Sequence, residues 1–426
     1  MCYQGLSLAL VSLLVSVSFG DVQVNTYVTS DQCDARITTC GANGFSVVWA
    51  SKGQDGSYSG VYGQRFDHFG AAQGGEFQVN VTTFGTQRQP DVAMDLGGSF
   101  VVAWQSADAD LEGIWGRRYA ADGTPRGGEF QINSYEANRQ LYPRLSMSNS
   151  GAFMTAWQSN LIAVPDGHSA EWYTCAQAYD ANGMPTGSES VVNLLPHAHY
   201  QEPMVDPAGG WLVGFTRSGD SGHLPLGDSM LVRRFNESGV AREDPVTLLS
   251  SGTGGFASDG SGNVLITYYW DYATGDENDI WGQWFTPSFE PRGSAFRVNS
   301  TTLGDQGDPH VAVNRQGQAI IAWWSGHEGN GFDLFAQAYD VDGTPLGEEF
   351  RLNDEVTGNQ FMGDLTLNDD GWFGAVWHSS DGYGSGVFAD FGQIPEPSTA
   401  ILLALSGLRC FRWRRREIRR RGRVLR

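Results

Sequence analysis

The chain has 426 residues and a net charge of −21, and glycine and aromatic residues are frequent while only 18% of the residues are charged. This composition is typical of a globular protein rich in strands and turns, and it excludes a disordered or coiled-coil chain. Ten arginines lie beyond Gly407, so the preceding part is more acidic still, and we expect it to repel nucleic acid.

The chain begins with an apolar run, "LSLALVSLLVSVSFG", which ends in small residues at Ser18 and Gly20. This pattern predicts a signal peptide over residues 1–20, removed by signal peptidase before Asp21, although the preceding "MCYQG" carries no Lys or Arg. We therefore expect an exported protein.

The body of the chain repeats a short apolar run that ends in an aromatic residue. Consecutive aromatic residues are 53 to 58 positions apart, which predicts seven repeats. The seven aromatic residues are Trp49, Trp104, Trp157, Phe215, Tyr268, Trp323 and Trp377.

Each repeat contains four β-rich runs separated by Gly, Asp, Asn or Pro. In the second repeat they span residues 90–94, 100–106, 113–119 and 129–133. Four short strands per repeat and seven repeats predict an all-β fold, a seven-bladed β-propeller of four-stranded blades over residues 21–393.

The seventh repeat has three of its strands, at residues 363–367, 372–377 and 386–391, and lacks the fourth. The segment "DVQVN" at residues 21–25 matches the fourth strand of the other repeats, such as "EFQVN" at residues 76–80. Because an unpaired edge strand invites aggregation, we expect the N-terminal strand to complete the last blade and close the ring.

The stretch "GVYGQRFDHFG" at residues 60–70, followed by "GGEFQVN", resembles repeats of large secreted bacterial surface proteins. The resemblance covers most of the body and is weaker in repeats three to five. It implies an extracellular binding or structural role.

The C-terminal segment, residues 394–426, contains Pro395, Glu396 and Pro397, then an apolar run at residues 398–408, then an arginine cluster that includes Arg414, Arg415 and Arg416. This order resembles the PEP-CTERM sorting signal of exported bacterial proteins. The resemblance implies a short membrane helix, cleavage by an exosortase-type enzyme, and delivery to the cell envelope, outer surface or matrix of a Gram-negative-type bacterium. Eleven apolar residues cover about half of a hydrocarbon core, so the helix either extends toward Trp413 or acts transiently.

Two sets of residues are candidate ligand sites that packing or solvation explains better. The repeated aromatic residues recur at equivalent positions of the second and third strands, which indicates packing between blades. The acidic loops between these strands, including "GDENDI" at residues 275–280, lack the spacing of a known calcium loop. We therefore predict no resident cofactor or metal, with calcium as an alternative.

A third set lies where the innermost strands begin, and a propeller gathers these positions around one end of its channel. Aligned on the following apolar residue, the set is Arg36, Asp91, Arg144, Met204, Phe256, His310 and Asp364. Five of the seven are ionisable. Arg36, Asp91 and Arg144 are candidate binding residues, with ion pairs between blades as the alternative, and His310 and Asp364 are candidate acid–base catalysts.

The sequence thus predicts an exported propeller, sorted to the envelope or matrix, that serves as a non-catalytic binding or structural module. Two alternatives are a glycoside hydrolase or lyase acting on extracellular polysaccharide, and a calcium-dependent adhesin. Its expected partners are signal peptidase, an exosortase-type enzyme and extracellular polysaccharide.

Overall fold

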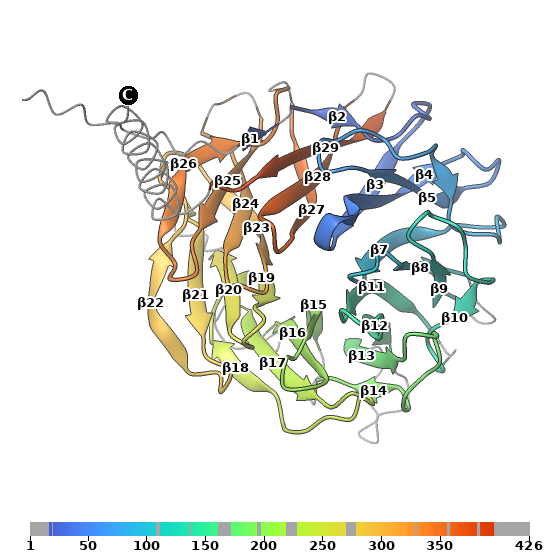
Figure 1. Ribbon diagram of the computed structural model, residues 1–426, viewed down its shortest axis with the longest axis horizontal. Coiled ribbons are helices and arrows are strands. Elements are labelled where there is room, and N and C mark those ends of the chain that lie inside the picture. The colour runs from blue at the N-terminus through green and yellow to red at the C-terminus, as the bar shows by residue number, and fades with distance from the viewer. Residues whose placement is uncertain are drawn as a thin grey trace, which may run out of the picture.

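The protein folds as a ring of seven sheets around a central channel, six of four strands and the last of five (Figure 1). The computed structural model describes residues 17–18, 20–107, 111–135, 138–160, 172–193, 197–218, 228–269, 278–327, 329, 331–355, 358–380 and 384–395. Within these ranges the secondary structure is all β apart from one 3₁₀ turn at Gly41–Asn43. The predicted all-β, seven-bladed architecture is confirmed.

Within each blade the strands run antiparallel from the channel outward. The innermost strands are β3 (Gln32–Thr39), β7 (Arg88–Met94), β11 (Gln140–Met147), β15 (Ala198–Val205), β19 (Thr253–Ser258), β23 (Gln306–Val313) and β27 (Phe361–Leu367). The second strands are β4 (Phe45–Lys52), β8 (Phe100–Ser106), β12 (Phe153–Asn160), β16 (Trp211–Arg217), β20 (Val264–Tyr269), β24 (Ala319–Ser325) and β28 (Trp372–Ser380).

The third strands are β5 (Ser59–Phe66), β9 (Gly113–Tyr119), β13 (Trp172–Tyr179), β17 (Ser229–Phe235), β21 (Trp281–Phe285), β25 (Asp333–Tyr339) and β29 (Ser385–Gln393). The outermost strands are β6 (Phe77–Gln78), β10 (Phe130–Gln131), β14 (Ser190–Val191), β18 (Val246–Leu249), β22 (Pro291–Arg297), β26 (Pro345–Arg351) and, in the seventh blade, β2 (Val22–Gln23). Several outermost strands are shorter than predicted, as in the second repeat, where β10 keeps two residues of the expected five.

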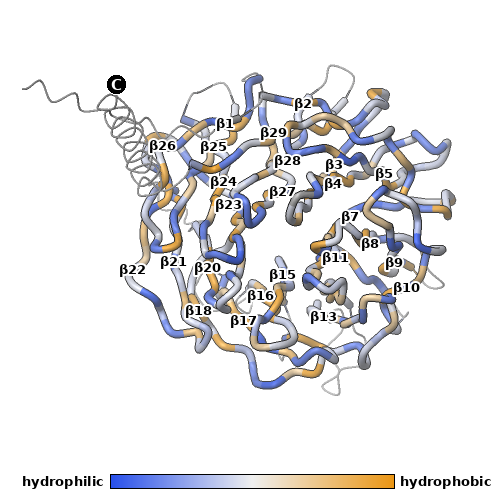
Figure 2. The backbone as a smooth tube through the Cα atoms, viewed as in Figure 1, coloured by the Kyte–Doolittle hydropathy of each residue, from blue (hydrophilic) through white to orange (hydrophobic). Residues whose placement is uncertain are grey.

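The core lies between neighbouring blades, as the recurrence of the aromatic residues predicts. Trp104 of β8 is buried in a cluster with Val48 and Val61 of the preceding blade. Hydrophobic residues occur in all seven blades (Figure 2), and second strands such as β8 are buried along their whole length, so both faces of a sheet pack against neighbouring blades. Burial of one such aromatic side chain contributes about 2–3 kcal/mol.

A repeated asparagine at the end of the outermost strand joins adjacent blades. The Oδ1 atom of Asn80 accepts a hydrogen bond of 2.7 Å from the backbone NH of Val61, and its Nδ2 donates to Oε1 of Gln87 at the start of the next blade, at 3.2 Å. The same acceptor bond recurs at Asn25, Asn133, Asn193, Asn299 and Asn353. Because these amides are buried, each bond also satisfies a polar group that would otherwise be costly.

The N-terminal strand completes the seventh blade, as predicted. Val22 and Gln23 of β2 pair with Ala389 and Phe388 of β29, and Asn25 accepts the NH of Val387 at 2.7 Å. Asp21 accepts the backbone NH of Asp354 at 2.9 Å, just as Glu76 of the first blade accepts that of Thr26 at 2.8 Å.

Strand β1 (Val17–Ser18) also pairs with β29, at Gln393 and Gly392, although it lies on the leader side of the predicted cleavage position. The rest of the predicted signal peptide, and the sorting segment beyond Pro395, lie outside the described residues. In the described part of the chain, no helix has the length and hydropathy needed to cross a membrane.

Candidate functional site

A cavity of about 670 Å³ occupies the central channel, and all seven innermost strands contribute to its wall. These strands lie around the channel axis in Figure 1, and most of them line the cavity with their middle and C-terminal residues, such as Asp91 to Met94 of β7. Residues distant in sequence therefore meet at one place in the fold.

In six of the seven blades, a β-bulge near the start of the innermost strand precedes a side chain that lines the cavity. Such a register shift occurs in every blade except the fifth, for example between Cys33 and Arg36 against β4. The residue that follows the bulge pairs with the residue just before the repeated aromatic. We call this set the channel ring: Arg36, Asp91, Arg144, Glu202, Gly255, His310 and Asp364.

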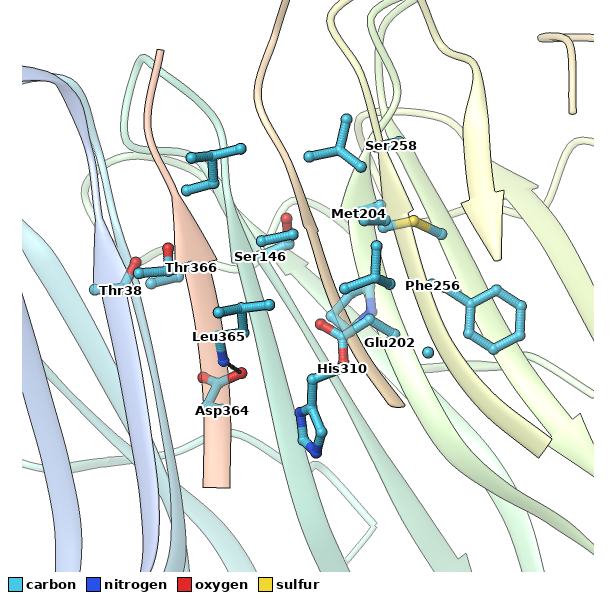
Figure 3. A pocket seen from close by; sticks show the side chains of 18 of the residues that line it. Thr38, Ser146, Glu202, Met204, Phe256, Ser258, His310, Asp364, Leu365 and Thr366 are labelled. Atoms are coloured by element: carbon cyan, nitrogen blue, oxygen red, sulfur yellow. Dashed lines mark hydrogen bonds between the residues drawn. The ribbon is translucent and has the colours of Figure 1, made fainter. Parts of the chain in front are cut away.

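The sequence alignment was wrong at two of these seven positions. Met204 pairs with Leu212 and Phe256 pairs with Ile266, so both lie deeper along their strands than the ring. The error at Met204 arose because Pro203 follows Glu202 and displaces the apolar residue on which the alignment relied. Both residues nevertheless line the cavity (Figure 3).

Glu202 is thus the site residue that sequence reasoning missed. A better signal was present, because every ring residue precedes the repeated aromatic residue of its blade by 13 positions. Counting back from Phe215 identifies Glu202 without reference to local hydrophobicity.

Two of the three ring carboxylates, Asp91 and Asp364, accept hydrogen bonds from backbone groups of the neighbouring blade. Asp91 Oδ2 accepts the NH of Leu145 at 2.6 Å, and Asp364 Oδ2 accepts the NH of Ile37 at 3.0 Å. Arg36 donates to the backbone carbonyl of Gly363. Among the described residues, no ion pair joins two members of the ring. Arg144 and Arg36 still act on Asp91 through their charge, so the alternative of ion pairs between blades stays a prediction.

Three ring side chains keep hydrogen-bonding capacity for a ligand. Within the described ranges, no group hydrogen-bonds the carboxyl of Glu202. Arg144 donates to the carbonyl of Pro143 at 2.9 Å, and His310 Nε2 lies 3.8 Å from Asp308 Oδ2. Figure 3 shows Glu202, His310 and Asp364 among the side chains that line the cavity.

Burial gives two ring carboxyls unusual protonation. It raises the pKa of Glu202 to about 8, and the negative charge of Asp91 adds to the effect while Arg144 opposes it. Burial also raises the pKa of Asp91 to about 6, again against the effect of Arg144. Both shifts favour the protonated form, more strongly for Glu202 on β15 than for Asp91 on β7.

No protein-family model and no curated protein matches the sequence. Among solved structures, the chain is similar to the polysaccharide lyase Uly1, with a TM-score of 0.51, 12% identity, and coverage of 87% of this chain and 89% of that one. It is also similar to a protein of unknown function from Dyadobacter fermentans DSM 18053, with a TM-score of 0.50, 9% identity, and coverage of 89% and 99%. At these identities the likeness shows the fold alone.

The described residues contain no group of three or more His, Cys, Asp and Glu side chains that could hold a metal ion. Residues 108–110 and 270–277, which belong to two of the acidic loops, lie outside the described residues. The alternative of bound calcium therefore stays a prediction for these loops.

Proposed function

We propose that the protein is an exported carbohydrate-binding propeller that holds a sugar chain at the channel ring. One observation carries the proposal, namely the convergence of donors and acceptors with spare hydrogen-bonding capacity on one solvent-open cavity. Sugars present many hydroxyl groups, and a polar cavity with fixed hydrogen-bonding groups provides orientation and specificity for such a ligand.

Enzymatic action on polysaccharide is the second candidate, and the two shifted carboxyls favour it. A protonated acid and an ionised carboxylate in one cavity are the requirements of general acid–base catalysis. In this case Glu202 would donate a proton to a leaving oxygen, with Asp91, His310 or Asp364 as the base. One protein of similar fold is a polysaccharide lyase, but the proposal rests on the residues of this chain.

We expect the double variant His310→Ala, Asp364→Asn to lose at least tenfold in affinity for its sugar. Cellohexaose, chitohexaose and hexagalacturonate are the probes, measured by titration calorimetry with and without calcium. Asparagine keeps an acceptor for the NH of Ile37, so the ring should remain folded. The matched control is Arg126→Ala, an exposed residue outside the cavity, which should bind normally.

Full affinity in the double variant would reject the ring as the site, and absence of binding to all three probes would reject carbohydrate binding. Release of new reducing ends or of unsaturated product, abolished by Glu202→Gln, would replace the binding module with the enzyme.

We further propose that the C-terminal segment sorts the protein to the cell surface, by a transient membrane helix and cleavage by an exosortase-type enzyme. The position of the motif supports this, because Ile394 is buried, donates its NH to Gly371 at 2.9 Å, and stands next to Pro395 at the end of the seventh blade. Cleavage after this point would leave the ring intact.

Mass spectrometry of protein released from the cell surface should therefore find no peptide beyond Pro397. A mature form that still carries "RWRRR" would contradict the sorting proposal.

A further inference from the structure

The bulge that precedes the channel ring forces a non-glycine residue into the left-handed backbone region in five of the seven blades. These residues are Asp34, Gln89, Tyr142, Tyr200 and Asp308, with φ between 48° and 56°. L-residues avoid this conformation, bulky ones most of all, whereas glycine adopts it without strain. Two tyrosines at such positions suggest a role other than folding.

The two tyrosines belong to adjacent innermost strands and are exposed. Tyr142 of β11 has 42% of its surface exposed and Tyr200 of β15 has 62%. The backbone carbonyl of Tyr142 accepts a hydrogen bond from the side chain of Gln201, which joins the two bulges. Tyr200 also lines the central cavity, and Tyr142 occupies the equivalent bulge of the preceding blade.

A neighbouring histidine holds the ring of Tyr200 in place. The rings of His199 and Tyr200 meet edge to face with centroids 4.9 Å apart, and His199 Nε2 lies 2.9 Å from Asp228 Oδ2. Partial burial, and then the carboxylates of Asp308 and Asp228, raise the pKa of the Tyr200 phenol. The exposed aromatic side chain therefore lies in a region of negative charge.

We propose that Tyr142 and Tyr200 form a tyrosine platform that stacks against the apolar face of a sugar ring at the channel mouth. A pyranose has a face of C–H groups and a rim of hydroxyls, which suits an aromatic surface bordered by carboxylates. The next sugar of the chain then reaches the channel ring, because Glu202 follows Tyr200 by two residues on the same strand. The platform rests on the proposed function, carbohydrate binding at this channel.

The test separates the aromatic ring from the backbone strain. Tyr200→Gly removes both, so we expect affinity for the bound hexasaccharide to fall at least tenfold while Tm stays equal or rises by about 1–2 °C. Tyr142→Gly should behave likewise. Gln89→Gly relieves the same strain without removing an aromatic ring, and its affinity should stay within twofold of the original. Tyr200→Phe should bind normally if stacking carries the interaction.

The outcomes distinguish the tyrosine platform from carbohydrate binding at the channel ring. If the tyrosine variants bind normally while His310→Ala, Asp364→Asn loses affinity, the channel binds sugar and the platform is rejected. An equal loss in Gln89→Gly would also reject the platform, because it would trace the effect to the backbone. Absence of binding to cellohexaose, chitohexaose and hexagalacturonate by the unaltered protein would overturn both.

Discussion

Deletion of residues 21–26 should lower Tm by about 6 °C, because the seventh blade loses its outermost strand. Val24, which is 2% exposed, would leave the cluster between the seventh and first blades. The hydrogen bonds of Asn25 to Val387, Tyr27 and Gln32 would also be lost. Burial of one valine and three hydrogen bonds together contribute about 5 kcal/mol.

The repeat supplies a matched control for this deletion. Asn25→Ala and Asn133→Ala remove equivalent hydrogen bonds, one in the strand from the N-terminus and one in a continuous blade. Their Tm values should fall by similar amounts, and by less than in the deletion. Calorimetry that finds the same Tm for the truncated and intact proteins would rule out closure by the N-terminal strand.

The fold could be predicted from the sequence because the same pattern recurs in all seven blades. Trp49, Trp104 and their counterparts occupy the same packing position in every blade. The repeat length can therefore be recognised even where single repeats are irregular. The closing strand was predictable for the same reason, since Asp21 and Asn25 occupy the positions of Glu76 and Asn80. Strand ends were less predictable, because turns and ladder bonds decide them locally.

The site was only partly predictable, because it depends on register rather than on composition. The sequence correctly placed five ring residues on the cavity wall, namely Arg36, Asp91, Arg144, His310 and Asp364. In the fourth blade it selected Met204, two residues beyond the true ring residue Glu202. The tyrosine platform could not be predicted at all. The left-handed backbone at Tyr142 and Tyr200 arises from the bulge against the second strand. Glycine is the usual sequence signal of this conformation, and neither position is a glycine.

Glu202→Gln should make the protein more stable above pH 8 and reduce the pH dependence of its stability. The folded state raises the pKa of Glu202 to about 8, whereas an unfolded chain releases this proton near pH 4. The unfolded state therefore binds fewer protons between these values, so stability falls as pH rises from about 4 to about 8. For this half-buried carboxyl we expect a loss of order 3 kcal/mol, which glutamine, being neutral throughout, avoids.

Urea unfolding at pH 5, 6.5 and 8.5 measures this effect. Asp91 also has a raised pKa, of about 6, and it remains in the variant, so the interval from pH 6.5 to 8.5 isolates Glu202. The matched control is Glu348→Gln, at an exposed glutamate of β26 outside the cavity. The stability of this variant should follow that of the original protein at each pH.

If the free energy of unfolding of Glu202→Gln falls in parallel with that of the original protein from pH 6.5 to 8.5, Glu202 does not hold a proton in the folded state. The acid–base candidate would then lose its proton donor, whereas sugar binding through Arg144 and His310 would still stand.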